Sequence, residues 1–351
     1  MRYRHLGGTG IEVSAYCLGT MMFGSVGNPD HEDSVRIIHT ALDAGINFVD
    51  TADMYSSGES EVITGKALKG RRDQVVLATK GHFPLAEGPN RGGNSRRHLI
   101  NAVEDSLRRL DTDWIDLYQV HRFDPHTDLE ETLGVLGDLV TAGKIRAFGS
   151  STFPAEEIER AQHVADRRGL RRFRTEQPPY SLLARGIEKH VLPTCRRHGM
   201  GVLAWSPLAS GFLTGKYRQG RELDLSSGRP TVMPHRFDPA LPVTAAKLAV
   251  VEELVALAEE LGSTLPELAH AFPASHPDVT SVIIGPRTME QLTDSLKGAA
   301  LVLDDAVLDR IDEIVEPGTD VYPPDGAWRL PSLRDPAGRR RPLTDRAAAS
   351  A

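Results

Sequence analysis

Residues 115–151 of this chain read IDLYQVHRFDPHTDLEETLGVLGDLVTAGKIRAFGSS. The two ends of this stretch, 115–121 and 145–151, are short apolar runs, and the part between them, 129–142, has helical periodicity. Apolar runs of this length are typical of strands that are covered on both faces. A helix between two such strands indicates that the strands lie parallel in one sheet.

The same unit recurs from one end of the chain to the other. Eight strands are predicted, at 15–19, 46–52, 74–80, 115–121, 145–151, 173–177, 201–206 and 281–285. The helices predicted among them lie at 31–44, 59–69, 95–110, 129–142, 154–169, 186–198, 244–261 and 288–298. This alternation favours an α/β protein with a closed (β/α)8 barrel, the TIM barrel, over an open doubly wound sheet.

Three segments fall outside this repeat. Residues 2–14 carry a Gly-Gly-Thr-Gly turn between two short β-like runs, which predicts a hairpin at the floor of the barrel. Residues 217–243 form a loop that is too long for a simple connection. An additional short helix is predicted at 265–276, where Pro273 should end or kink it.

The last part of the chain differs in composition from the rest. After a final predicted helix at 304–315, residues 316–351 are rich in Pro, Gly and Arg and lack periodicity. We predict a single domain over 1–337, which includes a long C-terminal loop, and a mobile tail at 338–351.

Composition excludes several classes of protein. The chain has 351 residues with 41 basic and 48 acidic side chains and a formal charge of −7, so neither nucleic acid nor an anionic membrane is expected as a partner. No apolar run approaches the roughly 20 residues that a membrane helix needs, and the N-terminus lacks the apolar core of a secretion signal. Cys17 and Cys195 can form neither a disulfide framework nor a cysteine metal cluster. The histidines are scattered, so no metal site is predicted, and we expect a soluble cytoplasmic enzyme.

Four polar side chains are expected to meet where the barrel strands end. Period-two alternation makes Asp50, Lys80 and His121 the last inward-pointing residues of three neighbouring strands. Tyr55 follows on the loop after Asp50. Functional groups of parallel barrels gather at the C-terminal rim, so a carboxylate, an ammonium, an imidazole and a phenol should share one pocket.

This combination of groups is suited to the reduction of a carbonyl. A free tyrosine has a pKa of about 10, and the ammonium of Lys80 should lower the pKa of Tyr55 and ease proton donation. Asp50 would keep the buried Lys80 charged. Neutral His121 can donate a hydrogen bond to the oxygen that receives the proton. The chain has no hydride donor of its own, so a cofactor must supply the hydride.

Each of these residues alone also has an ordinary structural explanation. Asp50 could cap a loop, Tyr55 could be a surface aromatic residue in a turn, and His121 could be a rim residue without a chemical role. Lys80 is harder to explain in this way, because a lysine that ends a buried strand needs a partner. The prediction therefore rests on the conjunction of the four groups.

Longer motifs carry a family resemblance. They are LGTMMFG (18–24), NFVDTADMYSSGESE (47–61), VVLATK (75–80), DLYQVHRFDP (116–125), GKIRAFGSST (143–152), AWSPLASGFLTGKY (204–217) and IIGPRTMEQL (284–292). With these motifs in this order over residues 2–315, the chain resembles the aldo-keto reductases, which are NADPH-dependent carbonyl reductases built on a (β/α)8 barrel. In detail it is similar to a bacterial branch that includes aryl-alcohol and sugar-ketone reductases and that resembles potassium-channel β subunits.

The resemblance implies a role for each matching position. It implies a catalytic tetrad of Asp50, Tyr55, Lys80 and His121, in which Tyr55 is the general acid. It implies an NADP(H) site formed by Gly19, Thr20, Met21, Asp50, Ser151, Thr152, Gln177, Trp205, Ser206, Pro207, Leu208, Gly211, Leu213, Lys216, Gly285, Arg287, Gln291, Asp294 and Ser295. Thr152 and Ser295 stand where the family usually has Asn, which puts only the affinity in doubt.

The residues themselves also favour a phosphate site at the end of the eighth strand. A Gly-Pro-Arg-Thr sequence at 285–288 joins that strand to a helix, and a helix N-terminus can bind phosphate. Arg287 would supply a planar fork of donors and Lys216 a point charge. Both features favour NADPH over NADH. No Gly-x-Gly-x-x-Gly motif follows a strand, so a Rossmann domain is not supported.

The substrate pocket is predicted from position alone. The first loops and the C-terminal segment should cover the rim, and they contribute Met22, Phe23, His82, Phe123 and Trp328. We predict the reduction of an aldehyde or ketone, either aromatic, aliphatic or sugar-derived, as a small-molecule substrate. Two alternatives are a cofactor-binding regulatory subunit with slow turnover and a barrel isomerase or lyase without a nicotinamide. The sequence leaves the substrate and the oligomeric state open.

Overall fold

The computed structural model describes residues 1–221, 223, 226, 229–232, 234–238, 240–326, 335–343 and 346. Eight parallel strands form a closed barrel in the order β10-β3-β4-β5-β6-β7-β8-β9. They are Tyr16–Gly19 (β3), Phe48–Asp50 (β4), Val76–Gly81 (β5), Ile115–Val120 (β6), Ile145–Ser151 (β7), Thr175–Gln177 (β8), Gly201–Ala204 (β9) and Val279–Ile284 (β10). Each matches one predicted strand, and the (β/α)8 barrel is confirmed.

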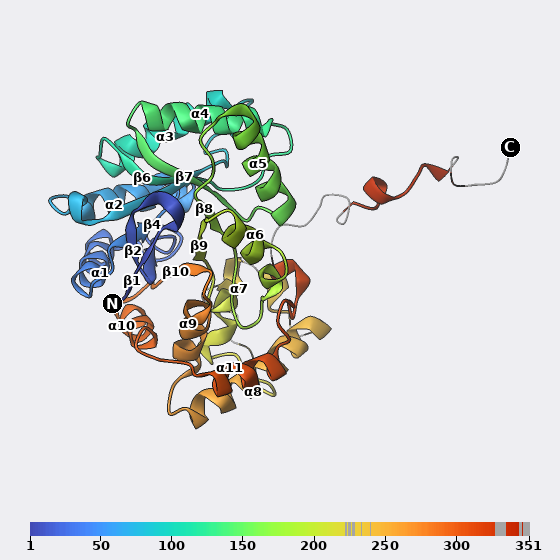
Figure 1. Ribbon diagram of the computed structural model, residues 1–351. Helices are drawn as coiled ribbons and strands as arrows, with labels where there is room; N and C mark the ends of the chain where they lie inside the picture. Colours follow the sequence, from blue (N-terminus) through green and yellow to red (C-terminus); the bar gives the residue numbers. More distant parts are fainter. Residues whose placement is uncertain are drawn as a thin grey trace.

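Helices cover the outside of the barrel (Figure 1). They are His31–Asp43 (α1), Glu59–Leu68 (α2), Arg96–Leu110 (α3), Leu129–Thr141 (α4), Ala155–Arg168 (α5), Val191–Arg197 (α6), Arg229–Val232 (α7), Pro242–Glu260 (α8), Leu265–Ser275 (α9), Met289–Gly298 (α10) and Asp305–Ile314 (α11). The extra helices predicted at 265–276 and 304–315 are therefore present as α9 and α11. Within the part of the chain that the structure describes, no helix combines the length and the apolar character needed to cross a membrane.

The helix predicted at 186–198 is divided in the structure. A 3-10 turn at Gly186–Glu188 is followed by the separate helix α6, which begins at Val191. Pro193 lies in the first turn of α6, and its ring would clash with the carbonyl of residue 189 in a continuous helix. Proline is tolerated in the first turn of a helix, so the chain restarts there. Pro273, in contrast, lies in the last turn of α9, and that helix ends at Ser275.

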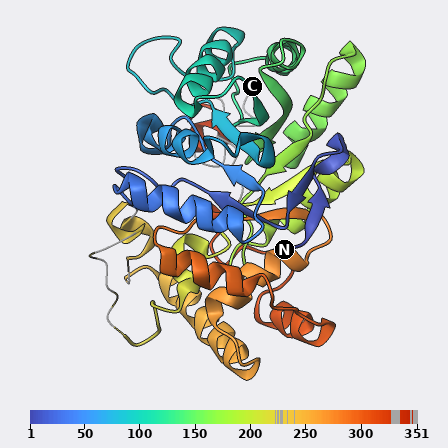
Figure 2. The same ribbon diagram turned by 90° about the vertical axis from the view of Figure 1, so that its left-hand side faces the viewer.

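The predicted hairpin closes the amino-terminal end of the barrel (dark blue, beside the N label in Figure 2). Strands Tyr3–His5 (β1) and Glu12–Ser14 (β2) pair antiparallel, and the 3-10 turn Gly7–Thr9 (η1) joins them. Leu6 and Val13 are fully buried and belong to the apolar cluster inside the barrel. Gly7 has φ of +52°, and a Cβ there would lie 2.6 Å from the backbone nitrogen of Gly201. This close approach seats the turn against the start of β9.

Alternation along the strands sets which residues reach the rim. The cluster inside the barrel contains Phe48 from β4 and Ala78 from β5. Successive residues of a strand point to opposite sides, so Asp50 and Lys80, two positions further along, also point inward. The larger apolar cluster lies between the strands and the surrounding helices and contains residues such as Val49. The fold thus brings polar side chains to one end of an otherwise apolar interior.

A buried carboxyl group supports the turn that follows β7. Glu176 on β8 is fully buried, and its Oε1 accepts a hydrogen bond of 3.0 Å from the backbone nitrogen of Phe153. Its Oε2 accepts one from the hydroxyl of Ser150. Burial raises the pKa of Glu176 to about 7, although these hydrogen bonds act in the opposite direction. The group therefore changes its charge near neutral pH.

The contact between α2 and α3 provides a test of the packing. A Cβ on Gly65 of α2 would lie 2.4 Å from the carbonyl oxygen of Leu110, so Gly65→Ala should destabilise the protein by about 1–3 kcal/mol. Gly134 in α4 is the matched control, because its nearest neighbour is a side-chain nitrogen of Arg96 at 3.4 Å. There, Gly134→Ala should be neutral or stabilise by up to about 1 kcal/mol. Urea unfolding measures both changes, and equal effects would contradict this packing.

Glu176 provides a test of the buried charge. An acid whose pKa is raised in the folded state adds stability below its unfolded pKa of about 4.5, and this stability is lost as the pH rises through about 7. The free energy of unfolding of the wild type should therefore fall relative to Glu176→Gln by about 3 kcal/mol between pH 4.5 and 8. Asp53, whose burial also raises its pKa to about 7, is present in both proteins and cancels in the difference. Parallel stability curves would show that Glu176 does not titrate in this range.

Candidate active site at the carboxyl rim of the barrel

The structure brings the four predicted catalytic side chains together at the rim. Asp50 is the last residue of β4, Lys80 lies in β5, and His121 directly follows β6. These three strands are neighbours, with Asp50 paired to Ala78 and Lys80 paired to Gln119. Tyr55 begins the 3-10 segment Tyr55–Gly58 (η2). The predicted positions of all four residues relative to the strands are thus found in the fold.

Lys80 is at the centre of this group. Its Nζ donates hydrogen bonds of 2.5 Å to Oδ2 of Asp50, 2.7 Å to the carbonyl oxygen of Thr51 and 3.4 Å to Oη of Tyr55. Lys80 has no exposed surface and Asp50 only 2%. The rings of Tyr55 and His121 lie edge to face with their centroids 5.9 Å apart. A phenol, an ammonium and an imidazole therefore share one small volume.

Two glutamines complete the environment of Asp50. The Nε2 of Gln119 donates a hydrogen bond of 3.2 Å to Oδ1 of Asp50, and the Nε2 of Gln177 donates one of 2.9 Å to the same oxygen. With Lys80 on Oδ2, both oxygens of the buried carboxylate are satisfied. Gln177 was predicted only as a cofactor residue and Gln119 not at all. Gln119 could have been predicted, because alternate residues of β6 point into the barrel and Gln119 lies two positions before His121.

Burial and charge act on the ionisation of these groups in different directions. Burial alone would lower the pKa of Lys80, but the Asp50 carboxylate and the Tyr55 hydroxyl outweigh burial, and the pKa is raised. For Tyr55 the prediction was wrong in its net direction, because burial raises the pKa more than Lys80 lowers it. Burial, followed by the charges of Lys80 and Arg122, holds the pKa of His121 well below its usual value. At neutral pH Lys80 is charged, Tyr55 keeps its proton and His121 is neutral.

His121 has a nitrogen that the protein leaves without a partner. Its Nδ1 is buried and has no hydrogen-bond partner among the residues that the structure describes. Buried polar atoms are normally paired, so an orphan of this kind points to a binding partner. Because the ring is neutral, it can donate one hydrogen bond and accept another.

Two further residues beside His121 were not predicted. The Phe83 ring packs edge to face on His121 with a centroid distance of 5.1 Å. The guanidinium carbon of Arg122 lies 5.8 Å from the centre of the Phe83 ring. Arg122 also donates a hydrogen bond of 2.6 Å to the carbonyl oxygen of His121. Their places directly after Lys80–Gly81–His82 and after His121 were the only sequence signal.

Strained backbone is concentrated at this rim. Residues other than glycine rarely adopt positive φ, and such residues cluster at functional sites. Six of the eight that the described part of the chain contains lie within two residues of a predicted site residue or coincide with one: Ser56, Ser57, Thr152, Ser206, Ala209 and Ser210. The loops at the rim therefore contain left-handed backbone conformations that are uncommon for residues other than glycine and that are typical of functional sites.

The residues predicted to hold a nicotinamide carboxamide form one compact group at the ends of β7 and β8. Thr152 has φ of +57°, and its backbone nitrogen donates a 3.0 Å hydrogen bond to the carbonyl oxygen of Gln177. The Ser151 hydroxyl donates a 3.0 Å hydrogen bond to the same oxygen. Since the Gln177 side chain also bonds Asp50, this group is connected directly to the four rim side chains.

The segment predicted to wrap a pyrophosphate follows β9. Trp205 is partly exposed, and its backbone pairs with Pro178 and Tyr180. Next come Ser206, Pro207 and Leu208 and then the 3-10 segment Ala209–Thr214 (η5), which contains Gly211 and the buried Leu213. The backbone nitrogens of Ala209 and Gly211 donate hydrogen bonds of 2.9 and 2.8 Å to the carbonyl oxygens of Ser206 and Leu208, which hold this turn in place. Lys216 is exposed and makes no ion pair with any residue in the described part of the chain.

The residues predicted to bind the adenosine end lie at the start of α10. Arg287 follows Gly285, the residue after β10, and its guanidinium makes no ion pair among the residues described. Gln291 accepts a hydrogen bond of 2.8 Å from the Arg287 backbone nitrogen. Asp294 pairs with Lys297 at 2.9 Å, and the Ser295 hydroxyl donates to the Gln291 carbonyl oxygen. The last two predicted residues are therefore engaged within their own helix.

The remaining predicted residues lie around β3 and β5. Gly19 ends β3, and Thr20, which is buried, bonds the backbone of Asp50 and the hydroxyl of Ser60. Residues at the same rim include the partly exposed Met21, Met22, His82 and Phe123. Phe23 has no exposed surface and packs in the outer apolar cluster, so in this structure it presents no wall to a ligand. Trp328 lies outside the described residues. In the described ranges, no three His, Cys, Asp or Glu side chains are grouped so that they could hold a metal.

Comparisons with known proteins give the family. The model described as "Aldo/keto reductase family" matches residues 15–316. The uncharacterized oxidoreductase YrpG of Bacillus subtilis is 39% identical over an alignment of 342 residues that covers 93% of this chain and 100% of that protein. A probable voltage-gated potassium channel subunit beta of Arabidopsis thaliana is 36% identical over 90% of this chain and 97% of its own length. Versiconal hemiacetal acetate reductase of Aspergillus parasiticus is 33% identical over 89% of this chain and 96% of its own length.

The match to the family begins just before β3 and ends beyond β10, so it contains every strand of the barrel and the four side chains at its rim. The alignments with YrpG and with the Arabidopsis protein also cover nearly the whole length of those two proteins. This chain therefore belongs to the aldo/keto reductase family and is an oxidoreductase.

Proposed function

We propose that this protein reduces an aldehyde or a ketone with NADPH and that Tyr55 donates the proton. The observation that carries the proposal is the distance of 3.4 Å between Oη of Tyr55 and Nζ of Lys80, together with the pairing of Lys80 to Asp50. The carbonyl carbon gains a hydride and the carbonyl oxygen gains a proton, which gives an alcohol. When bound, the nicotinamide supplies the hydride.

The four rim side chains have separate tasks in this proposal. Tyr55 keeps its proton at neutral pH, because burial raises its pKa, and so it is present as the acid. As the proton leaves, the Lys80 ammonium stabilises the phenolate. Asp50 keeps Lys80 charged and in place. Neutral His121 donates a hydrogen bond to the carbonyl oxygen and holds it within reach of Tyr55.

The other rim residues fit a phosphorylated dinucleotide. Lys216 and Arg287 are cations without ion pairs in the described part of the chain, and both follow strands of the barrel. A planar guanidinium such as that of Arg287 suits a phosphate monoester, which supports NADPH over NADH.

A second candidate function follows from the relatives. The Arabidopsis protein, 36% identical to this chain, is named as a probable potassium channel subunit beta. A regulatory subunit that binds NADPH and turns over slowly would use the same rim residues. Tight retention of NADPH, negligible turnover with a panel of carbonyl compounds and a co-purifying membrane-protein partner would favour this function over the first.

Tyr55→Phe tests the proposed acid. The variant keeps the ring but loses the proton, so NADPH oxidation with an aromatic aldehyde should fall by at least about 100-fold. Binding of NADPH, followed by quenching of tryptophan fluorescence, should change by less than about threefold, because Tyr55 is not proposed to hold the cofactor. Activity within tenfold of the wild type would contradict the role of Tyr55.

Arg287→Ala tests the choice of nucleotide. If Arg287 binds the 2′-phosphate, its loss removes a charge-assisted hydrogen bond and should raise the Kd for NADPH at least about tenfold. The Kd for NADH should stay the same, since NADH lacks that phosphate. Arg97→Ala, which removes an exposed arginine from α3, is the matched control and should leave both constants unchanged. Equal losses of affinity for NADPH and NADH would show that Arg287 does not contact the 2′-phosphate.

A further inference from the structure

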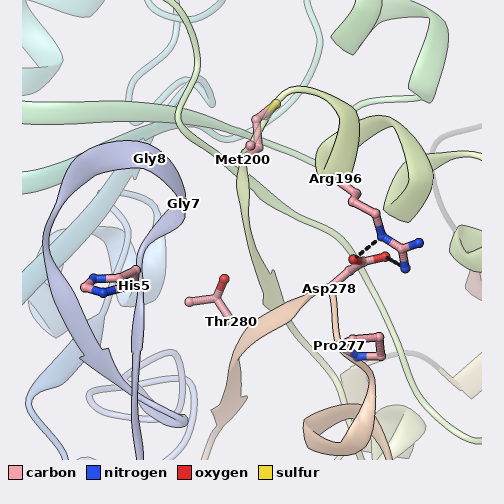
Figure 3. A pocket seen from close by; sticks show the side chains of 9 residues that line it. His5, Gly7, Gly8, Arg196, Met200, Pro277, Asp278 and Thr280 are labelled. Atoms are coloured by element: carbon pink, nitrogen blue, oxygen red, sulfur yellow. Dashed lines mark hydrogen bonds and ion pairs between the residues drawn. The ribbon is translucent and has the colours of Figure 1, made fainter.

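Two cavities lie on either side of the hairpin turn at the barrel floor, and Gly8 of η1 lines both. The first has a volume of about 400 Å³ and is shown in Figure 3. Its only strong cation is Arg196, which makes a bidentate ion pair with Asp278 at 2.6 and 2.7 Å. The charge of this cavity is therefore already balanced by the protein.

The second cavity has a different electrostatic character. It has a volume of about 290 Å³, and Arg146, Arg171, Arg172 and Arg174 all line it. None of the four makes an ion pair with any residue that the structure describes, whereas fourteen other arginines in the described part of the chain are paired. Four arginines line one small cavity on a chain with a net charge of −7, and together they form a local concentration of positive charge. The guanidinium carbon of Arg146 also lies 5.7 Å from the centre of the Trp114 ring.

The acidic residues of the neighbouring helix α4 do not neutralise this cavity. Asp138 pairs with Arg96 at 2.6 Å, and Glu130 pairs with Arg168 at 2.8 Å. Burial, followed by the charges of Arg172 and Arg171, lowers the pKa of Arg174. Arg171 and Arg172 therefore repel Arg174 in the free protein, and an anion placed beside these three side chains would relieve this repulsion.

The sequence brings these arginines together through the barrel. Arg146 lies in β7, and the other three lie in the segment between α5 and β8, the next strand. Arg171 and Arg172 are adjacent in the sequence, a pattern typical of a solvated surface. The fold instead sets them beside Arg146 and next to the apolar side chains of Ile11 and Val140.

We propose that this cavity, which we call the arginine pocket, binds a small molecule that carries several phosphate groups. Guanidinium groups bind phosphate oxygens in pairs through a planar fork of donors, and several arginines that line one cavity match a ligand with more than one phosphate. The pocket is concave and small, and the protein as a whole is acidic, so a compact polyanion fits better than a nucleic acid or an acidic protein surface. The pocket lies at the floor, at the opposite end of the barrel from the Tyr55 site, and does not depend on the proposed reaction.

Binding of inorganic tripolyphosphate, measured by calorimetry at low ionic strength, tests the arginine pocket. The measurement uses the full chain with Lys216→Ala and Arg287→Ala as the background, which weakens any phosphate binding at the rim. In this background we expect saturable binding of about one tripolyphosphate per chain. Adding Arg171→Gln and Arg172→Gln should weaken it at least tenfold, because charge-assisted hydrogen bonds are lost.

Controls separate the pocket from the total charge. Arg97→Gln with Arg340→Gln removes the same charge from exposed positions elsewhere and should change the affinity by less than about twofold. Arg171→Lys with Arg172→Lys keeps the charge but loses the fork, and should still weaken binding at least threefold. Equal thermal midpoints of the variants show that they are folded. The proposal is overturned if the background protein does not bind tripolyphosphate, if the Arg97 and Arg340 control loses as much affinity as the pocket variant, or if only a nucleic acid binds with saturation.

Discussion

The ion pair between Lys80 and Asp50 is the constraint on which the rest of the rim depends. Both groups are buried, so removal of either partner would leave an uncompensated charge, at a cost of about 3–5 kcal/mol. The protein surrounds the pair with neutral donors, since Gln119 and Gln177 complete the bonding of the carboxylate. A lysine held in this way places a fixed positive charge beside the phenol of Tyr55. The ion pair therefore has an electrostatic effect on Tyr55 in addition to its effect on stability.

Two strongly polar regions lie at opposite ends of the barrel, and its apolar interior separates them. The interior between them is apolar, with Phe48, Ala78 and Leu117 filling it, and the hairpin residues Leu6 and Val13 close its lower end. Polar chemistry is therefore confined to the two ends. At the upper end the backbone is strained and Lys80 is paired with Asp50, whereas at the lower end the arginines of the arginine pocket make no ion pair among the described residues. The rim and the floor thus differ in the feature that would favour ligand binding, which is a preformed backbone at the rim and uncompensated positive charge at the floor.

Much of this fold follows from local patterns in the sequence. The eight strands and the rim position of Asp50, Tyr55, Lys80 and His121 could be predicted, because period-two alternation and strand ends are local properties. The division of the helix at 186–198 depends on a single proline, Pro193, and a helical period does not reveal it. The net pKa of Tyr55 depends on how much water the folded chain excludes, and the grouping of Arg146 with Arg172 depends on neighbouring strands. Both are properties of the assembled barrel.

The pairing of β3 with β10 also affects how the chain can be made. Cys17 lies opposite Ile283, so the first and last strands of the cylinder come from nearly opposite ends of the polypeptide. During synthesis the edge of β3 stays open until residue 284 has left the ribosome. Long-range parallel contacts of this kind form slowly, and unpaired edges attract other chains. Production of this protein at high concentration should therefore depend on chaperones that shield the nascent sheet until its two edges meet.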